Sequence, residues 1–218
     1  MINSVTPVKS RRPYRSPVRE QAALLSREAV VVAAHRVFVE HGYASATIDE
    51  IARRAGVSRP TVFAVGTKPQ LLALARLKAI EGEHLVSNDR RFRDVLAIPD
   101  PDQLLRRFAA FTADIARRLG PLAAVLEQAA PGDSELTELL ERSQRDLHGC
   151  ARAVASAVHS AGALTGEISV KRAADVIWLL IQPTQYQRLV TQQRWTHRAY
   201  ERWHADTMVR LLIDPDRG

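Results

Sequence analysis

The stretch that decides the fold reads TIDEIARRAGVSRPTVFAVGTK and spans residues 47–68. Thr47 can start a short helix because its hydroxyl can accept a hydrogen bond from the Glu50 amide, while the Glu50 carboxylate can reach back to the cap. Gly56 interrupts that helix after about two turns, and Ser58 is a favoured N-cap for the next one. The stretch therefore predicts two short helices joined by a tight glycine turn.

A further helix is expected upstream of this pair. From Arg27 onward, apolar side chains recur with helical spacing. Gly42 can adopt the left-handed conformation that closes such a helix without steric cost. The apolar positions are Val30, Ala34, Val37 and Phe38. Together these patterns predict a compact head of three helices.

The last helix of this head matches the recognition helix of a helix-turn-helix, which enters the major groove of DNA. It is capped by Ser58, tolerates Pro60 in its first turn and presents Arg59, Thr61 and Phe63. A purely structural pack is the alternative, but it does not explain why the outward positions are basic. Those positions are Arg53, Arg54, Arg59 and Lys68. We therefore predict DNA binding.

The net charge of +7 is concentrated at one end of the chain. Residues 1–75 hold eleven Lys and Arg against five Asp and Glu, a difference of +6. Residues 76–218 hold twenty against nineteen, a difference of +1. A local positive surplus favours an anionic polymer as partner, most commonly nucleic acid, with improved solubility as the alternative.

Residues 1–20 have too few large apolar groups to offset the entropy of ordering, so we expect a flexible basic arm. Arg12 and Arg15 precede the first helix by enough chain to reach a minor groove. A solubilising tail is the alternative reading. The head is then expected to span residues 21–75.

Residues 76–218 read as helical with no strand alternation, which predicts an all-α protein with a larger helical body after the head. Pro183 interrupts an apolar helical run and should kink it, which can open a cavity. The candidate pocket residues are Phe108, Phe111, Trp178, Gln182 and Tyr186. They combine apolar walls with a few polar tips, although ordinary core packing is the alternative. Because the body offers few inward charges, we expect a small apolar or aromatic effector.

Several function classes are disfavoured. The single cysteine, Cys150, can form neither an intrachain disulfide nor a thiolate cluster, and a buried thiol is a simpler reading than a redox sensor. The seven histidines lack the spacing of a helical zinc site, so a metalloenzyme is a weak third alternative. No phosphate loop, nucleophile elbow or carboxylate pair is apparent. We expect no enzymatic activity, no cofactor and no metal.

The longest apolar runs are 29–34 and 176–181, six residues each, far short of the ~18 that would suggest a membrane span. The N-terminal segment has no apolar core of a secretory signal. We therefore expect a cytoplasmic protein that does not bind membranes.

About fifty residues of the head resemble the tetracycline-repressor (TetR) family of regulators. The matching positions are 33–38, Gly42, Tyr43, 47–52, 55–58, 61–63, Lys68, Leu71 and Leu72. The resemblance implies an all-α homodimer with a DNA-binding head and a ligand-binding body. It also implies a transcriptional repressor as the usual case, which a small molecule would release from DNA.

The resemblance also assigns roles to single residues. Thr47 and Lys68 would contact phosphates, whereas Arg59 and Thr61 would reach base edges. Phe63 stands where the family usually has Tyr, so a hydroxyl donor to phosphate is lost. The turn before Lys68 is one residue shorter than the common pattern and must be tighter, and Gly66 would permit an unusual dihedral there.

One recognition helix reads only a few base pairs, so two heads and a palindromic operator are expected. Composition and the resemblance assign the dimer contacts to the last two helices. The candidate interface residues are Val176, Leu180, Leu189, Trp203, Thr207 and Leu211. These apolar side chains could instead pack against helices of their own chain. The rival function is an all-α dimer that binds a ligand or a partner and has a degenerate head, suggested only by Phe63 and the short turn.

Overall fold

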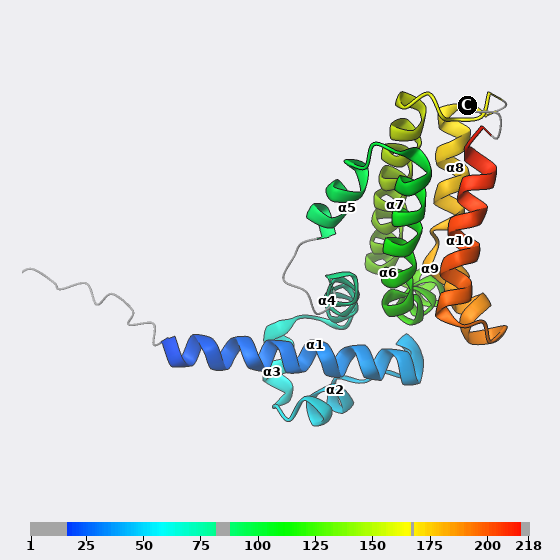
Figure 1. Ribbon diagram of the computed structural model, residues 1–218. Coiled ribbons are helices and arrows are strands. Elements are labelled where there is room, and N and C mark those ends of the chain that lie inside the picture. Colours follow the sequence, from blue (N-terminus) through cyan, green and yellow to red (C-terminus); the bar gives the residue numbers. More distant parts are fainter. Residues whose placement is uncertain (1–16, 82–87, 167, 215–218) are drawn as a thin grey trace, which may run out of the picture.

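The computed structural model describes residues 17–81, 88–166 and 168–214, which form an all-helical protein (Figure 1). The head contains α1 (Pro17–Ser45), α2 (Ile48–Ala55) and α3 (Arg59–Val65), and α4 (Lys68–Glu81) leads to the body. The body contains α5 (Asn88–Leu96), α6 (Pro101–Ala129), α7 (Ser134–Ser160), α8 (Val170–Leu180), α9 (Pro183–Tyr186) and α10 (His197–Leu212). The predicted all-α class is confirmed. Within the described ranges, no helix is both long and apolar enough to cross a membrane.

Helix α1 is longer than the apolar pattern indicated. It begins at Pro17, ten residues before Arg27, where the predicted helix starts, and from residue 21 onward its first buried side chain is Val30. Leu24 and Leu25 on the added turns remain 67% and 63% exposed, so these turns lie outside the core. The segment expected to be a flexible arm therefore overlaps the first turn of α1.

Gly42 closes the long straight part of α1, as predicted from its position after His41. Its φ of 73° and ψ of 175° lie in a region that is essentially restricted to glycine. The positive φ is confirmed, although ψ differs from that of the left-handed helix. The chain then makes one more turn to Ser45 before α2 begins.

We expect Gly42→Ala to lower the free energy of unfolding by roughly 1 to 3 kcal/mol, the cost of forcing a side chain into this region. Gly149→Ala is the matched control, because Gly149 lies inside α7 with nothing within 4 Å of an added Cβ. This control should instead stabilise the protein by about 0.5 to 1 kcal/mol through helix propensity. Urea unfolding compares the two, and a neutral Gly42→Ala would contradict the strain argument.

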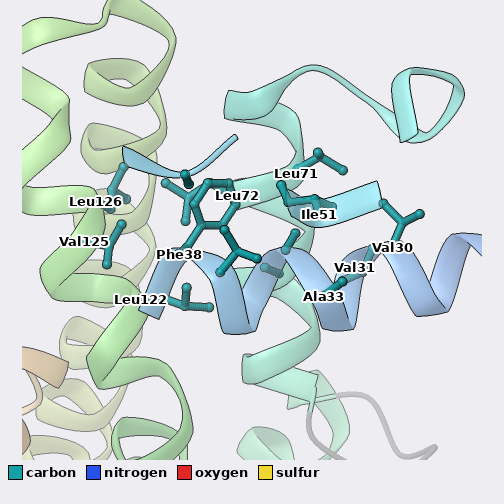
Figure 2. Packing of buried hydrophobic residues seen from close by; sticks show 14 of the residues in the cluster. Val30, Val31, Ala33, Phe38, Ile51, Leu71, Leu72, Leu122, Val125 and Leu126 are labelled. Carbon is teal, nitrogen blue, oxygen red and sulfur yellow. The ribbon is translucent and has the colours of Figure 1, made fainter. Parts of the chain in front are cut away.

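The core of the head continues into the body. Phe38 of α1 is fully buried and lies beside Leu72 of α4, facing the stretch of α6 that holds Leu122 and Leu126 (Figure 2). The Tyr43 hydroxyl adds a polar link, because it donates to the Asp133 carboxylate at the start of α7 (3.3 Å). The apolar cluster thus crosses the head–body boundary expected at residue 75.

The body is a helical bundle in which α7 packs against α8 and α6 packs against α10 (Figure 1). Pro183 breaks the apolar run as predicted: α8 ends at Leu180, and the proline starts α9. A π-helical turn, Gln187–Gln192, follows α9. The break places Gln182 and Pro183 against the interior between α6 and α7.

Candidate nucleic-acid interface and ligand cavity

Helix α2 begins at the predicted Thr47 cap, but the Glu50 carboxylate has other partners than predicted. The Thr47 hydroxyl accepts a hydrogen bond from the Glu50 amide (3.2 Å). The Glu50 carboxylate accepts from Arg53 (2.7 Å) and Arg54 (2.6 Å), so the predicted reach back to the cap is wrong. These two guanidinium groups hold the pKa of Glu50 at about 2, through hydrogen bonds first. A charged donor simply outcompetes the backbone amide for the carboxylate.

Arg54 was predicted to be an outward basic residue, but the structure does not place it on the outer surface. Its guanidinium forms ion pairs with Glu40 of α1 and Glu50 of α2, each at 2.6 Å, and its side chain is only 23% exposed. Arg54 therefore connects α1 to α2. Arg53, with a side chain 70% exposed, faces solvent as predicted.

Helix α3 packs on the core through Val62 and Val65 and exposes its other side to solvent. The Ser58 hydroxyl caps the helix by accepting from the Thr61 amide (3.3 Å), and the two hydroxyls lie 2.8 Å apart. Val62 is fully buried, whereas Phe63 is 55% exposed. The Arg59 side chain is exposed and pairs with the Asp49 carboxylate at 2.9 Å. A surface pair of this kind is weak, so Arg59 can exchange it for another partner.

Lys68 lies at the start of α4 and already has two contacts within the head. Its ammonium donates to the Ala44 carbonyl (3.3 Å) and lies 4.5 Å from the centre of the Tyr43 ring. Partial burial lowers the pKa of Lys68. Lys68 therefore fixes the end of α1 as well as presenting positive charge, a second role that the sequence did not indicate.

The short turn before Lys68 does not need an unusual dihedral. Gly66 has φ of 164° and ψ of 170°, an extended conformation open to any residue, so the turn does not use the conformational freedom that glycine permits. What constrains Gly66 is space, because an added Cβ would lie 2.9 Å from the Gln70 Cβ. Gln70 reaches back to accept from the Thr67 amide (3.0 Å), the reciprocal capping bond that had been expected at α2.

The body contains a cavity of about 830 Å³ between α4, α6 and α7 and the α8–α9 break. Phe108, Phe111 and Gln182 line it, as proposed from the sequence. Trp178 and Tyr186 are not among its lining residues. Further lining residues are Leu77, Ile80, Phe92, Ile115, Leu119, Leu140, Leu147 and Cys150. The volume and the apolar walls suit a small organic ligand.

Two aromatic residues that were expected in the wall lie behind it. The Trp178 indole donates to the Gln144 side-chain carbonyl (3.1 Å), and Gln144 exchanges hydrogen bonds with Gln182. Tyr186 packs against Tyr200, and its hydroxyl lies 3.0 Å from His197 Nδ1. The π-helical turn and α10 cover Tyr186, a long-range arrangement that local spacing does not encode.

Arg76 is the buried charge on the cavity wall, and sequence reasoning missed it. The residue is only 6% exposed, and its Nη2 donates to the Ser143 hydroxyl (3.0 Å). Its Nη1 is buried without any hydrogen-bond partner. Burial lowers the pKa of Arg76 to about 10, against the opposing attraction of Glu127. The sequence held one signal for this burial. Arg76 lies four residues after Leu72 and therefore shares its helix face.

Arg118 of α6 fastens the C-terminal end of α4 to the body. Its guanidinium donates to the Ala79 carbonyl (2.9 Å) and pairs with Asp114 on its own helix. The carbonyls at a helix C-terminus carry partial negative charge and lack intrahelical partners, so they favour such a donor. Helix α4 is thus held by Lys68 at the head and by Arg118 at the body.

Apolar side chains on α8, the π-helical turn and α10 are only partly covered by the rest of the described chain. Leu211 is 49% exposed, and Val176, Leu189, Trp203 and Thr207 are half-buried. Leu180 differs from the prediction, because it is buried in its own core at 8% exposure. Its neighbour Leu179 is 56% exposed and was missed. A one-residue step along a helix turns a side chain by about 100°, enough to exchange these two roles.

The histidines do not gather into a metal site in the part of the chain that the structure describes, where no cluster of three metal-ligating side chains occurs. His204 is fully buried beside Tyr200, with its Nε2 3.1 Å from the Thr112 hydroxyl. Burial lowers the pKa of His204 to about 4, so the ring is neutral at ordinary pH. Arg12 and Arg15 lie outside the described residues.

Comparison with known proteins assigns this architecture. Residues 30–64 match the family model of bacterial regulatory proteins of the tetR family. The structure is similar to that of NalD, the secondary repressor of the MexAB-OprM multidrug efflux pump in Pseudomonas aeruginosa, with 18% identity over 89% of this chain and 99% of that chain and a TM-score of 0.69. It is also similar to SmeT in its triclosan complex, with 18% identity over 88% of this chain and 93% of that chain and a TM-score of 0.67. No curated protein sequence matches. The head thus matches the tetR family model over residues 30–64, and the helix-turn-helix head with its helical body has the fold of TetR-type regulators.

Proposed function

We propose that this chain is a TetR-type transcriptional regulator that binds a palindromic DNA operator as a homodimer and represses transcription there. A small, largely apolar molecule that occupies the cavity of its body would release it. The observation that carries the DNA-binding part is the outer face of the head. Arg59 and Phe63 are exposed on α3 and Thr61 is partly exposed, whereas Val62 and Val65 pack toward the core of the head. A short, capped and basic helix of this kind fits the major groove.

Two further observations support the remaining parts. Exposed apolar side chains on α8 and α10, with Leu179 and Leu211 the most exposed, suit a two-fold seam. The cavity of about 830 Å³ lies against α4, the helix that joins head and body. Similarity to NalD, a repressor, and to SmeT, which binds triclosan, is consistent with repression and with ligand release.

Gel-shift measurement with the DNA upstream of the protein's own gene tests the DNA-binding part. We expect one retarded complex whose affinity falls steeply with salt, because lysine and arginine contacts to phosphates release counterions. Binding equal to that of an unrelated duplex at every salt concentration, for this and for other promoter fragments, would favour the rival function of a degenerate head.

Two substitutions separate base contacts from phosphate contacts. We expect Arg59→Ala to cost about 1 to 3 kcal/mol on the preferred duplex and to relax preference at one base position. Lys68→Ala should weaken all duplexes about equally and reduce the salt slope by about 1. Competition binding with single-base variants measures both. Since Lys68 also contacts Ala44, its variant is compared after a thermal melt has established the folded fraction. Uniform losses from both changes would mean that Arg59 does not read a base.

A further inference from the structure

Building on the proposed ligand-controlled function, we propose that the cavity selects an amphipathic monocarboxylate. Its carboxylate would be bound by the Arg76 guanidinium, and its apolar portion would lie along the phenylalanine-lined wall of α6. This proposal narrows the expectation of an apolar or aromatic effector by adding one negative charge at a defined place.

The first argument is the unsatisfied hydrogen-bonding capacity of Arg76. Buried polar groups almost always have partners, and a buried charge without one is costly. In the described ranges, three buried side-chain nitrogens have no hydrogen-bond partner: Arg76 Nη1, His35 Nε2 and His204 Nδ1. Among these residues, Arg76 alone lines the cavity. Its free donor therefore has a position from which a bound molecule can satisfy it.

The second argument is that the Arg76 guanidinium is held in a fixed orientation. Its Nη2 donates to Ser143 Oγ at 3.0 Å, and the same hydroxyl donates to the Leu139 carbonyl at 2.8 Å. Ser143 thus fixes Arg76 from α7 while α4 supplies its backbone. A guanidinium with fixed orientation and unused N–H groups matches the planar geometry of a carboxylate, which it can bind through two parallel hydrogen bonds.

The third argument is the distribution of the other charges on the cavity wall. Glu81, Glu127, Arg145 and Asp146 also line it, and all are exposed, so water solvates them. Glu127 attracts Arg76 but forms no ion pair with it among the contacts of the described residues. A cationic ligand group next to Arg76 would be repelled at short range in a poorly solvated site. Because Glu127 already supplies one remote negative charge, a single carboxylate suits the site better than two.

The fourth argument is the apolar length available beyond Arg76. Phe108 is fully buried, and Phe92 packs against both Phe108 and Phe111, with ring centroids 6.0 and 6.4 Å apart. Ile115 and Leu119 continue the wall along α6. Burying an alkyl or aryl chain here contributes about 25 cal/mol per Å² of apolar area. The site therefore combines one charged end with an apolar wall.

Calorimetry on the full chain tests the proposal with two matched ligand pairs: octanoate with octanamide, and 4-phenylbutanoate with 4-phenylbutanamide. Each amide has the shape of its carboxylate without the charge. We expect at least one carboxylate to bind about 10-fold or more tightly than its amide, the range of a hydrogen bond to a charged group. Equal or tighter binding of the amides, or no binding of either carboxylate, would overturn the proposal.

Variants then test whether Arg76 causes the preference for the carboxylate over the amide. Arg76→Met should reduce carboxylate affinity to the level of the amide and leave amide binding nearly unchanged. Arg145→Met removes an exposed arginine from the same wall and should preserve the preference, while Arg76→Lys should retain part of it. Thermal melts establish that each variant is folded. A preference that survives Arg76→Met in folded protein would assign the carboxylate to another group. DNA binding without ligand is measured separately, so failure of the regulator proposal remains distinguishable from failure of this one.

Discussion

A chain carrying Leu179→Glu together with Leu211→Glu is expected to be monomeric and to bind its operator about 10²- to 10⁴-fold more weakly. The loss follows because the second head of a dimer binds at high effective concentration, an advantage that a monomer lacks. Both leucines are exposed in the single chain, at 56% and 49%, so charges there should leave the fold intact. Within a two-fold seam, each charge would face an apolar surface and its own symmetry mate.

Sedimentation analysis and gel shift measure the two consequences in the same preparation. Gln128→Glu with Ser156→Glu is the matched control, since it adds two negative charges at exposed positions of α6 and α7. The control should remain dimeric and bind DNA with little change. A dimer that persists in the Leu179 and Leu211 variant would show that the seam lies elsewhere on the body.

Phe38→Ala is expected to lower the free energy of unfolding by about 3 to 5 kcal/mol, the range for removing a buried phenylalanine ring. The ring is fully buried and stacks on Tyr43 at 5.8 Å between centroids. It also lies against the α6 stretch around Leu122 and Leu126, so the cavity left behind would weaken the head and its attachment to the body (Figure 2).

Urea unfolding followed by circular dichroism measures this loss. Val39→Ala is the neighbouring control, because Val39 is 41% exposed and should lose less than about 1 kcal/mol. If Phe38→Ala destabilises the chain no more than the control does, the shared head–body core is not a principal source of stability.

The local features of the head could be predicted because each depends on a few adjacent residues. Thr47 and Ser58 cap their helices with their own hydroxyls, and Gly42 and Gly56 take positive φ where the chain turns. The reach of Glu50 was mispredicted because Arg53 and Arg54 compete for its carboxylate. Charge-assisted bonds between side chains are harder to foresee than backbone caps, since several rotamers are open to each partner.

The features of the body that were missed depend on contacts distant in sequence. Arg76 becomes a buried cavity residue only because α7 supplies Ser143, sixty-seven positions away. Leu179 rather than Leu180 is exposed because α7 decides which side of α8 is covered. Trp178 lies behind the cavity wall because its indole meets Gln144 on α7. Helical periodicity identifies a face, but it does not state which neighbour will cover it.

Selection of bound duplexes from a random pool by the purified full chain tests the central claim most directly. If two heads read DNA through α3, the recovered sequences should share an inverted repeat whose half-sites are centred about one helical turn apart or a multiple of it. Recovery of a single unrepeated motif, or of no enriched sequence at low salt, would contradict a dimeric, sequence-reading regulator.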